Sequence, residues 1–339
     1  MLTLSVCIAA VSPLCSQDRK LVVVRKDFEQ RYLQPDAHFA LAKYYIDKGN
    51  FVQAFFILEY ARRYRFEEKD FDDAYVAYFG DPMPEPPNNA KDAFAAASKL
   101  VSEQKYDEAE IYFQKADRLY DKSFFINAWT GRFYYMAKSD SAKALPFYFK
   151  AYFLYPHAYE TEYAEYRIRA ISIADAKNAF KIDRDKGKQL SELAHDENPL
   201  IVRMAIEQMA KEWKVEFLPV LLETLSNDDS VVRWSAFVTL NKFAGSSLEK
   251  IIDEMLTDRD LRKRGLAAYA VVERKGEEKF QVLKKMLDDR AELVRFDALS
   301  ALVGSGGVTG KQILQEHQRV EPQPRLKSLI ASALKKATN

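Results

Sequence analysis

Cysteine is almost absent from this sequence of 339 residues, and both copies, Cys7 and Cys15, lie near the N-terminus. A chain processed beyond Cys15 would contain no thiol, which excludes a disulfide framework, a zinc knuckle and a cysteine nucleophile. Histidine is also scarce, and the four copies are isolated, without the spacing of metal ligands: His38, His157, His195 and His317. We therefore expect no metal ion, no other cofactor and no catalytic residue.

An excess of charge of either sign is lacking as well. Lysine and arginine together number 51, against 50 aspartates and glutamates. The chain thus has no net field that would attract nucleic acid or an anionic membrane from a distance. Nucleic acid is not an expected partner.

The sequence has no hydrophobic run near its start that is long enough for a transmembrane helix. Residues 2–15 are largely apolar, but a spanning helix needs roughly 20 residues. The segment resembles the hydrophobic part of a secretory signal, although no basic residue precedes it. We predict a signal peptide over residues 1–16 and export to the periplasm or cell envelope. The alternatives are a lipid anchor on Cys15 and a buried segment retained in a cytosolic protein.

Aromatic residues are abundant, and their distribution divides the chain. Of the 41 phenylalanines and tyrosines, 35 lie in residues 1–180. Two different packing patterns are therefore expected. We predict an all-α fold, an alpha-alpha superhelix built from two kinds of helical repeat.

The first half carries small and large apolar residues at the spacing of a helix-turn-helix repeat of 34 residues. One copy has Leu41, Ala42, Tyr45, Gly49, Phe51, Ala54, Leu58 and Ala61. A second runs from Ala96 to Tyr120, with Gln104 in place of the turn glycine, and a third runs from Thr130 to Pro156. The pattern resembles tetratricopeptide (TPR) repeats.

That resemblance implies a groove, lined by the first helix of each repeat, that binds an extended peptide. The implied groove residues are Phe39, Lys43, Phe94, Arg132 and Tyr135. The groove would be apolar with cationic positions. Ordinary packing of helix faces is the alternative interpretation of each residue.

Other segments connect the repeats. Residues 17–34 are expected to be a linker before the TPR-like region, residues 35–180. Residues 80–89 contain four prolines in six positions, which favours an extended spacer. Residues 158–179 have the apolar spacing of one long connecting helix. Gly187 then marks the boundary.

The second half, residues 186–339, repeats an acidic turn followed by a helix start. Four arginines recur at intervals of 30, 31 and 31 residues: Arg203, Arg233, Arg264 and Arg295. The small residues Ala205, Ala236, Ala267 and Ala298 recur with them. This repeated sequence pattern resembles HEAT repeats, including the bacterial type that contains lyases attaching tetrapyrrole pigments.

The HEAT resemblance implies a structural ladder along the array, in which the turn acid of one unit pairs with the arginine of the next: Arg233, Arg264 and Arg295. The acids so implied are Asp228 or Asp229, Asp258 or Asp260, and Asp288 or Asp289. The alternative is a row of arginines that binds an anionic ligand. The glycine-rich segment from Gly304 to Lys311 lacks the spacing and the hydroxyl of a phosphate loop, so we interpret it as a connection between repeats.

These observations favour a non-enzymatic scaffold or assembly factor that binds proteins or peptides, located in the bacterial cell envelope. A lyase-like enzyme or enzyme subunit and a cytosolic regulatory adaptor are the alternatives. Oligomeric state is not indicated by any pattern in the sequence.

Overall fold

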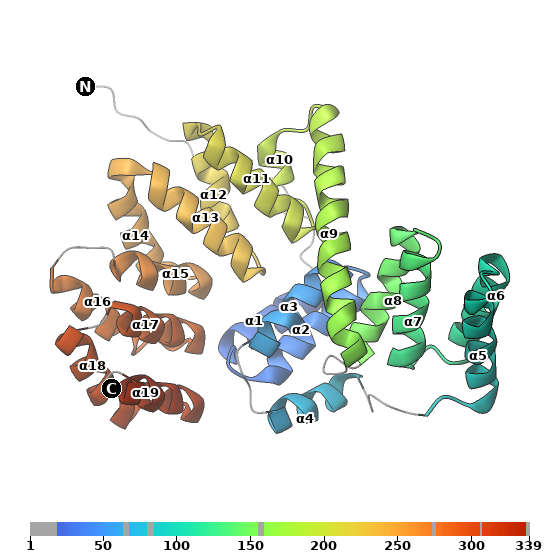
Figure 1. Cartoon of the computed structure of the whole chain (residues 1–339). Helices are drawn as coiled ribbons and strands as arrows, with labels where there is room; N and C mark the ends of the chain where they lie inside the picture. The colour runs from blue at the N-terminus through green and yellow to red at the C-terminus, as the bar shows by residue number, and fades with distance from the viewer. Residues whose placement is uncertain are drawn as a thin grey trace.

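The computed structural model describes residues 19–63, 68–79, 85–154, 159–272, 276–305 and 307–336. In these ranges the chain is all-α, with nineteen α-helices and no strand (Figure 1). The predicted fold class is confirmed at this level. The predicted signal peptide, residues 1–16, lies outside the described ranges.

Helices α1 to α9 make up the N-terminal half. Their bounds are α1 (Arg19–Gln30), α2 (Pro35–Asp47), α3 (Phe51–Arg63), α4 (Glu68–Phe79), α5 (Asn88–Ser102), α6 (Tyr106–Leu119), α7 (Phe124–Met136), α8 (Ser141–Leu154) and α9 (Tyr159–Asp185). Consecutive helices pack as pairs: α2 on α3, α5 on α6 and α7 on α8, with α9 covering α8. We call α2 to α9 the N-terminal array.

Each of these pairs turns through a residue with a left-handed backbone. Gly49, Gln104 and Ser139 have φ values of 75°, 58° and 53°. Glycine adopts this conformation without steric cost, whereas other residues do so uncommonly. Gln104 therefore keeps the geometry of the turn glycine that the sequence lacks at this position.

Small residues let the paired helices approach closely. Ala54, Ala97, Ala109 and Ala144 are fully buried between them. At Gly131 in α7, an added Cβ would lie 2.9 Å from the ring of Tyr148 in α8. This contact explains why glycine stands inside a helix, where it otherwise lowers stability.

Helices α10 to α19 form the C-terminal array. Their bounds are α10 (Leu190–Leu193), α11 (Pro199–Lys211), α12 (Leu218–Thr224), α13 (Ser230–Phe243), α14 (Leu248–Thr257), α15 (Leu261–Val272), α16 (Glu278–Met286), α17 (Glu292–Ser305), α18 (Gly307–Val320) and α19 (Pro324–Lys336). Short 3₁₀ turns precede α12 and α14 at Val215–Phe217 and Gly245–Ser247. Neighbouring helices again pack in sequence, which indicates a superhelical arrangement of helix pairs.

Polar side chains start the second helices of this array. The Asn198 side chain accepts a hydrogen bond from the Leu200 amide, and the Asp229 side chain accepts one from the Val232 amide. Such caps satisfy amides that have no partner within the helix. The four repeated alanines are fully buried on these second helices: Ala205, Ala236, Ala267 and Ala298.

Two helices lie where the sequence indicated connections. Residues 19–30, expected to be linker, form α1, and α4 lies between the first helix pair and the predicted spacer at residues 80–89. Of the proline-rich segment 80–89, residues 80–84 lie outside the described ranges, and Pro87 directly precedes α5. The long connecting helix extends beyond its predicted end to Asp185, and Gly187 follows with a φ of 88°.

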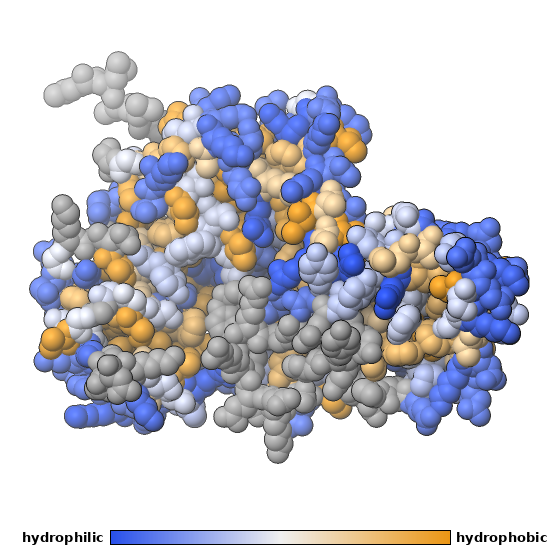
Figure 2. Space-filling view, in the orientation of Figure 1, coloured by the Kyte–Doolittle hydropathy of each residue, from blue (hydrophilic) through white to orange (hydrophobic). Residues whose placement is uncertain are grey.

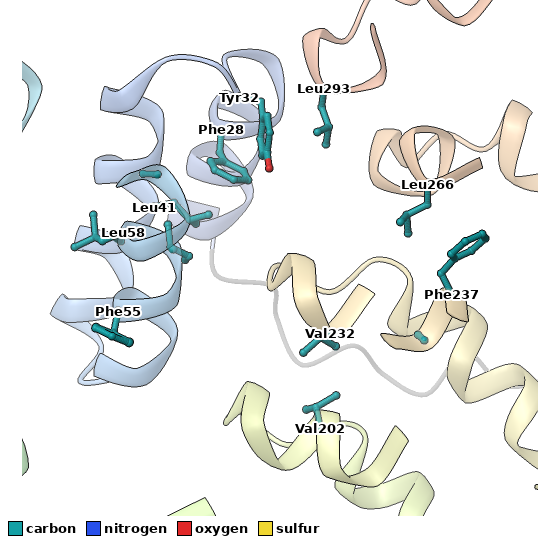
Figure 3. Close-up of a cluster of buried hydrophobic side chains, with 14 of the residues drawn as sticks. Phe28, Tyr32, Leu41, Phe55, Leu58, Val202, Val232, Phe237, Leu266 and Leu293 are labelled. Carbon is teal, nitrogen blue, oxygen red and sulfur yellow. The ribbon is translucent and has the colours of Figure 1, made fainter. Parts of the chain in front are cut away.

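The two arrays meet through α1 and α9. In Figure 1 the C-terminal array curves from α10 down to α19, and α1, α2 and α3 lie at the centre, between that array and α5 to α8. Phe28 and Tyr32 point from α1 and the following turn toward the C-terminal array (Figure 3). One continuous hydrophobic core contains both arrays.

On the face seen in Figure 2, apolar residues appear in small groups between hydrophilic ones. Across the ranges described, no helix is both long enough and apolar enough to span a membrane.

Candidate functional site

The five predicted groove residues do not share one surface. Phe39 is fully buried, because α4 covers it: its ring lies 4.9 Å from that of Phe71 and 5.7 Å from that of Tyr75. Lys43 lies on the same helix as Phe39, and its Nζ is 3.4 Å from the Asp47 carboxylate. The first pair therefore contributes no open groove at Phe39.

The other three predicted residues lie on one strip across α5, α7 and α9. We define the aromatic-arginine strip as Phe94, Phe125, Trp129, Arg132, Tyr135, Tyr163, Tyr166 and Arg167. Each member contacts another member through its ring or guanidinium group.

The strip begins with three rings. Phe94 of α5 and Phe125 of α7 have centroids 5.3 Å apart, and Phe125 and Trp129 are 6.0 Å apart. The Arg132 guanidinium lies 4.9 Å from the Trp129 ring and 5.8 Å from the Tyr163 ring of α9. These distances permit cation-π attraction, which joins α7 to α9 along the strip.

Arg167 is the centre of the second part. Its guanidinium lies 4.6 Å from the Tyr135 ring, 4.9 Å from the Tyr163 ring and 5.3 Å from the Tyr166 ring. Its Nε also donates a hydrogen bond of 2.9 Å to the Tyr163 hydroxyl. The three rings surround this cation on the surface and carry no negative charge of their own.

Exposure and charge distinguish this strip from ordinary core packing. Phe125 and Trp129 are each 38% exposed, and Tyr166 is 63% exposed. No carboxylate among the described residues forms an ion pair with Arg132 or Arg167. Three lysines of the same array are paired with carboxylates: Lys138 with Asp107, Lys143 with Glu110, and Lys150 with Asp117 at 3.1 Å. The strip therefore offers flat apolar surface beside two cations that pair with no carboxylate in the described ranges.

The sequence does not identify five members of this surface: Phe125, Trp129, Tyr163, Tyr166 and Arg167. The spacing of Phe125, Trp129 and Arg132 places all three on one face of a helix, and this signal was available. Tyr163 and Tyr166 were assigned only to the apolar spacing of the connecting helix. Pairing of α7 with α9 depends on tertiary contacts, so the sequence could not indicate it.

The repeated arginines form a ladder whose direction differs from the one the resemblance implied. Arg264 donates to the Asp289 carboxylate through Nε and Nη2 at 2.8 and 2.9 Å, and Arg295 binds Glu321 at 3.2 and 3.1 Å. These two arginines thus each reach the acid that follows, one unit further along, whereas Arg233 has no ion-pair partner among the described residues. Nη1 of Arg233, Arg264 and Arg295 donates to carbonyl oxygens of the preceding turn.

Helix geometry accounts for this difference. A helical side chain leans toward the N-terminus of its own helix, so the guanidinium lies over the carbonyls of its own turn. Its remaining edge then faces the next unit. Arg203 is an exception, because its Nε is buried and has no hydrogen-bond partner among the described residues.

The three ladder acids chosen from the sequence have other partners. The Asp258 carboxylate accepts a hydrogen bond from the Asp260 amide at 2.8 Å. Asp288 has its carboxylate 3.9 Å from Nδ1 of His317. Asp228 binds groups outside the ladder, on α1, α2 and α15.

Asp228 is the centre of the contact between the arrays. Its carboxylate accepts from Arg25 Nε at 2.7 Å, from Arg262 Nη1 at 2.8 Å and from the Tyr45 hydroxyl. Glu29 of α1 lies 3.6 Å from Arg262. Burial raises the pKa of Glu29, although the charge of Arg262 opposes this shift.

The remaining candidates for chemistry do not converge. Burial lowers the pKa of His38 to about 4, and its Nε2 lies 2.7 Å from the Tyr32 carbonyl. His195 contacts Glu223, His317 contacts Glu321, and His157 lies outside the described ranges. Within those ranges no three histidine, cysteine or acidic side chains are grouped as metal ligands would be. Gly304 and Gly307 lie in successive helices, α17 and α18.

A scan against family models, a search of the curated proteins and a search of the solved structures each found no match to this chain.

Proposed function

We propose that this chain is a non-enzymatic scaffold that binds an extended, acidic segment of another protein along the aromatic-arginine strip. In this proposal the N-terminal array is TPR-like and the C-terminal array is HEAT-like. The composition of residues 1–16 supports action in the bacterial cell envelope.

One observation carries the proposal: Arg132 and Arg167 lie on exposed aromatic rings and have no ion-pair partner in the described chain. A partner carboxylate would complete each site with a charge-assisted hydrogen bond. The rings of Trp129 and Tyr166 would contact flat or apolar side chains of the same segment.

The order of groups along the strip specifies the partner further. Rings of Phe94, Phe125 and Trp129 come first, and the two guanidinium groups follow, separated by Tyr163. A fitting segment therefore has an apolar or proline-containing part followed by two acidic residues. An extended segment can cross three helices, as peptides do in helical-repeat grooves.

Fluorescence anisotropy can test this proposal. The probes are labelled twelve-residue peptides with a proline and phenylalanine half and a half containing two glutamates. The double variant Arg132→Gln/Arg167→Gln should weaken their binding about tenfold or more, because each lost charged contact contributes on the order of 1 kcal/mol. The folding of the variant is checked by thermal melting.

Two controls make the outcome specific. Arg319→Gln, in the exposed part of α18, removes an equal charge far along the chain and should leave binding unchanged. Peptides with lysine in place of glutamate should bind poorly to every variant. Equal binding of both peptide sets, or equal loss in the control variant, would contradict the proposal.

A further inference from the structure

A crevice lies between α1 with the first helix pair on one side and the C-terminal array on the other. Two adjoining cavities of about 250 and 360 Å³ share the residues Tyr32, Ser230, Val231 and Arg233. Volumes in this range hold small molecules. The crevice is distinct from the aromatic-arginine strip, whose residues lie on α5, α7 and α9.

Three arginines line the first cavity, and one of them, Arg169 of α9, is paired with Glu59. Arg203 comes from α11 and Arg233 from α13. Nη1 of Arg233 is held by the carbonyl oxygens of Asn227 and Asp228 at 2.8 and 3.0 Å. Nε of Arg203 is buried without a hydrogen-bond partner among the described residues. A buried donor left unpaired costs free energy, which a bound acceptor would recover.

The carboxylates that line this first cavity are mostly occupied by other cations. Glu59 pairs with Arg169, and Asp228 pairs with Arg25 and Arg262. Asp229 lies near both arginines, but its Oδ1 already caps α13 through the Val232 amide at 2.8 Å. Arg203 therefore lines the first cavity, and its Nε has no hydrogen-bond partner among the described residues.

The second cavity supplies apolar surface beside these charges. Trp234 is 45% exposed, and its ring packs edge-on against Tyr269 at 5.4 Å. Leu266 and Leu293 line the same cavity, and Figure 3 shows both side chains in the space between Tyr32 and Phe237. A ligand that fills both cavities has an apolar body and an anionic group at one end.

We propose that this crevice binds a small amphipathic anion, with its anionic group on Arg203 and Arg233 and its apolar body against Trp234. The two arrays and α1 each contribute part of the site. Binding here is independent of the scaffold function proposed above, because none of the strip residues takes part.

The test uses 8-anilinonaphthalene-1-sulfonate, which joins an aromatic body to one sulfonate, and the uncharged N-phenyl-1-naphthylamine as its matched probe. The full chain should bind one sulfonate probe per molecule, with energy transfer from tryptophan. Arg203→Met should weaken that binding about tenfold and leave binding of the uncharged probe unchanged. Trp234→Phe should reduce the transferred emission, while the emission excited directly at the probe persists.

Arg203→Met should fold normally, since Nε has no hydrogen-bond partner to lose among the described residues, and thermal melting checks this. Arg203→Lys keeps the charge and should retain most of the affinity, and Arg319→Met on α18 is the control for a charge lost elsewhere. Equal affinity of the wild type for both probes would overturn the proposal. So would unchanged sulfonate binding in Arg203→Met, or several equivalent probes bound per chain.

Discussion

At the scale of single residues, close contacts between helices depend on positions where a side chain would not fit. Gly131 faces the buried ring of Tyr148, whereas a Cβ added at Gly304 in α17 would have no atom within 4 Å. The two glycines are both helical and make a matched pair. Gly131 cannot gain a side chain without movement of Tyr148, whereas Gly304 has room for one.

We expect Gly131→Ala to lower the free energy of unfolding by about 1–3 kcal/mol, because the added methyl overlaps the Tyr148 ring and forces repacking. Gly304→Ala should raise it by about 0.5–1 kcal/mol, since alanine favours an exposed helix over glycine. Urea unfolding monitored by circular dichroism measures both. Equal effects of the two substitutions would show that the Tyr148 contact is unimportant.

Asp297 on α17 predicts a pH dependence of stability. Burial raises its pKa to about 7, although the Tyr269 hydroxyl, 3.0 Å away, and the charge of Arg233 lower it. The unfolded value is about 3.9, so between these values the folded state holds a proton that the unfolded state releases. Stability contributed by this group is therefore full at low pH and lost as the pH rises toward 7.

Asp297→Asn should remove this loss. The variant is expected to be more stable than the wild type at pH 8, by on the order of 1 kcal/mol or more, and nearly equal to it at pH 4. Denaturant unfolding at both pH values gives the difference. Other titrating groups contribute equally to both proteins. A difference in the free energy of unfolding between variant and wild type that is the same at pH 4 and pH 8 would therefore refute a raised pKa at Asp297.

At the scale of elements, the sequence predicted most paired helices because their apolar spacing is regular. Ala54, Ala109 and Ala144 recur where helices cross, and Ala205 to Ala298 recur in the second half. The long helix α9 was also predictable from its spacing. These patterns are local, and local patterns are what a single sequence reveals.

Helices α1 and α4 were not predicted, because their partners are distant in the chain. Phe71 packs on Phe39, and Arg25 binds Asp228 across 203 residues. For the same reason Phe39 was assigned to a groove that α4 in fact covers. Arg132 and Tyr135 were found from their repeat positions, whereas Arg167 depends on how α9 crosses α7.

At the scale of the whole molecule, Asp228 joins three elements through one buried carboxylate. Its side chain is 6% exposed and contacts Arg25, Tyr45 and Arg262. Removal of one member of a buried ion pair leaves the other charges uncompensated. Asp228→Ala should therefore lower the free energy of unfolding by about 3 kcal/mol and loosen α1 from the C-terminal array.

Distances between spin labels can measure the loosening. Labels at Glu108→Cys in α6 and Gln315→Cys in α18, in a chain with Cys7 and Cys15 changed to serine, should give a narrow distribution. Asp228→Ala should broaden it, whereas Asp92→Ala in the exposed part of α5 should not. An unchanged distribution in Asp228→Ala would mean that other contacts position the two arrays.

Helix α1 and the turn after it touch three successive units of the C-terminal array. Arg25 reaches Asp228, Glu29 faces Arg262, and Tyr32 lies 6.5 Å from Phe296. These three partners are 34 residues apart in sequence, whereas Arg25, Glu29 and Tyr32 are spaced by only four and three residues. Repeat arrays commonly change length by duplication of a unit, but a unit inserted here would move two of the three partners out of reach. The contacts of α1 and its following turn therefore fit only the present spacing of these three units. A duplicated unit between them would be selected against, because it would break those contacts.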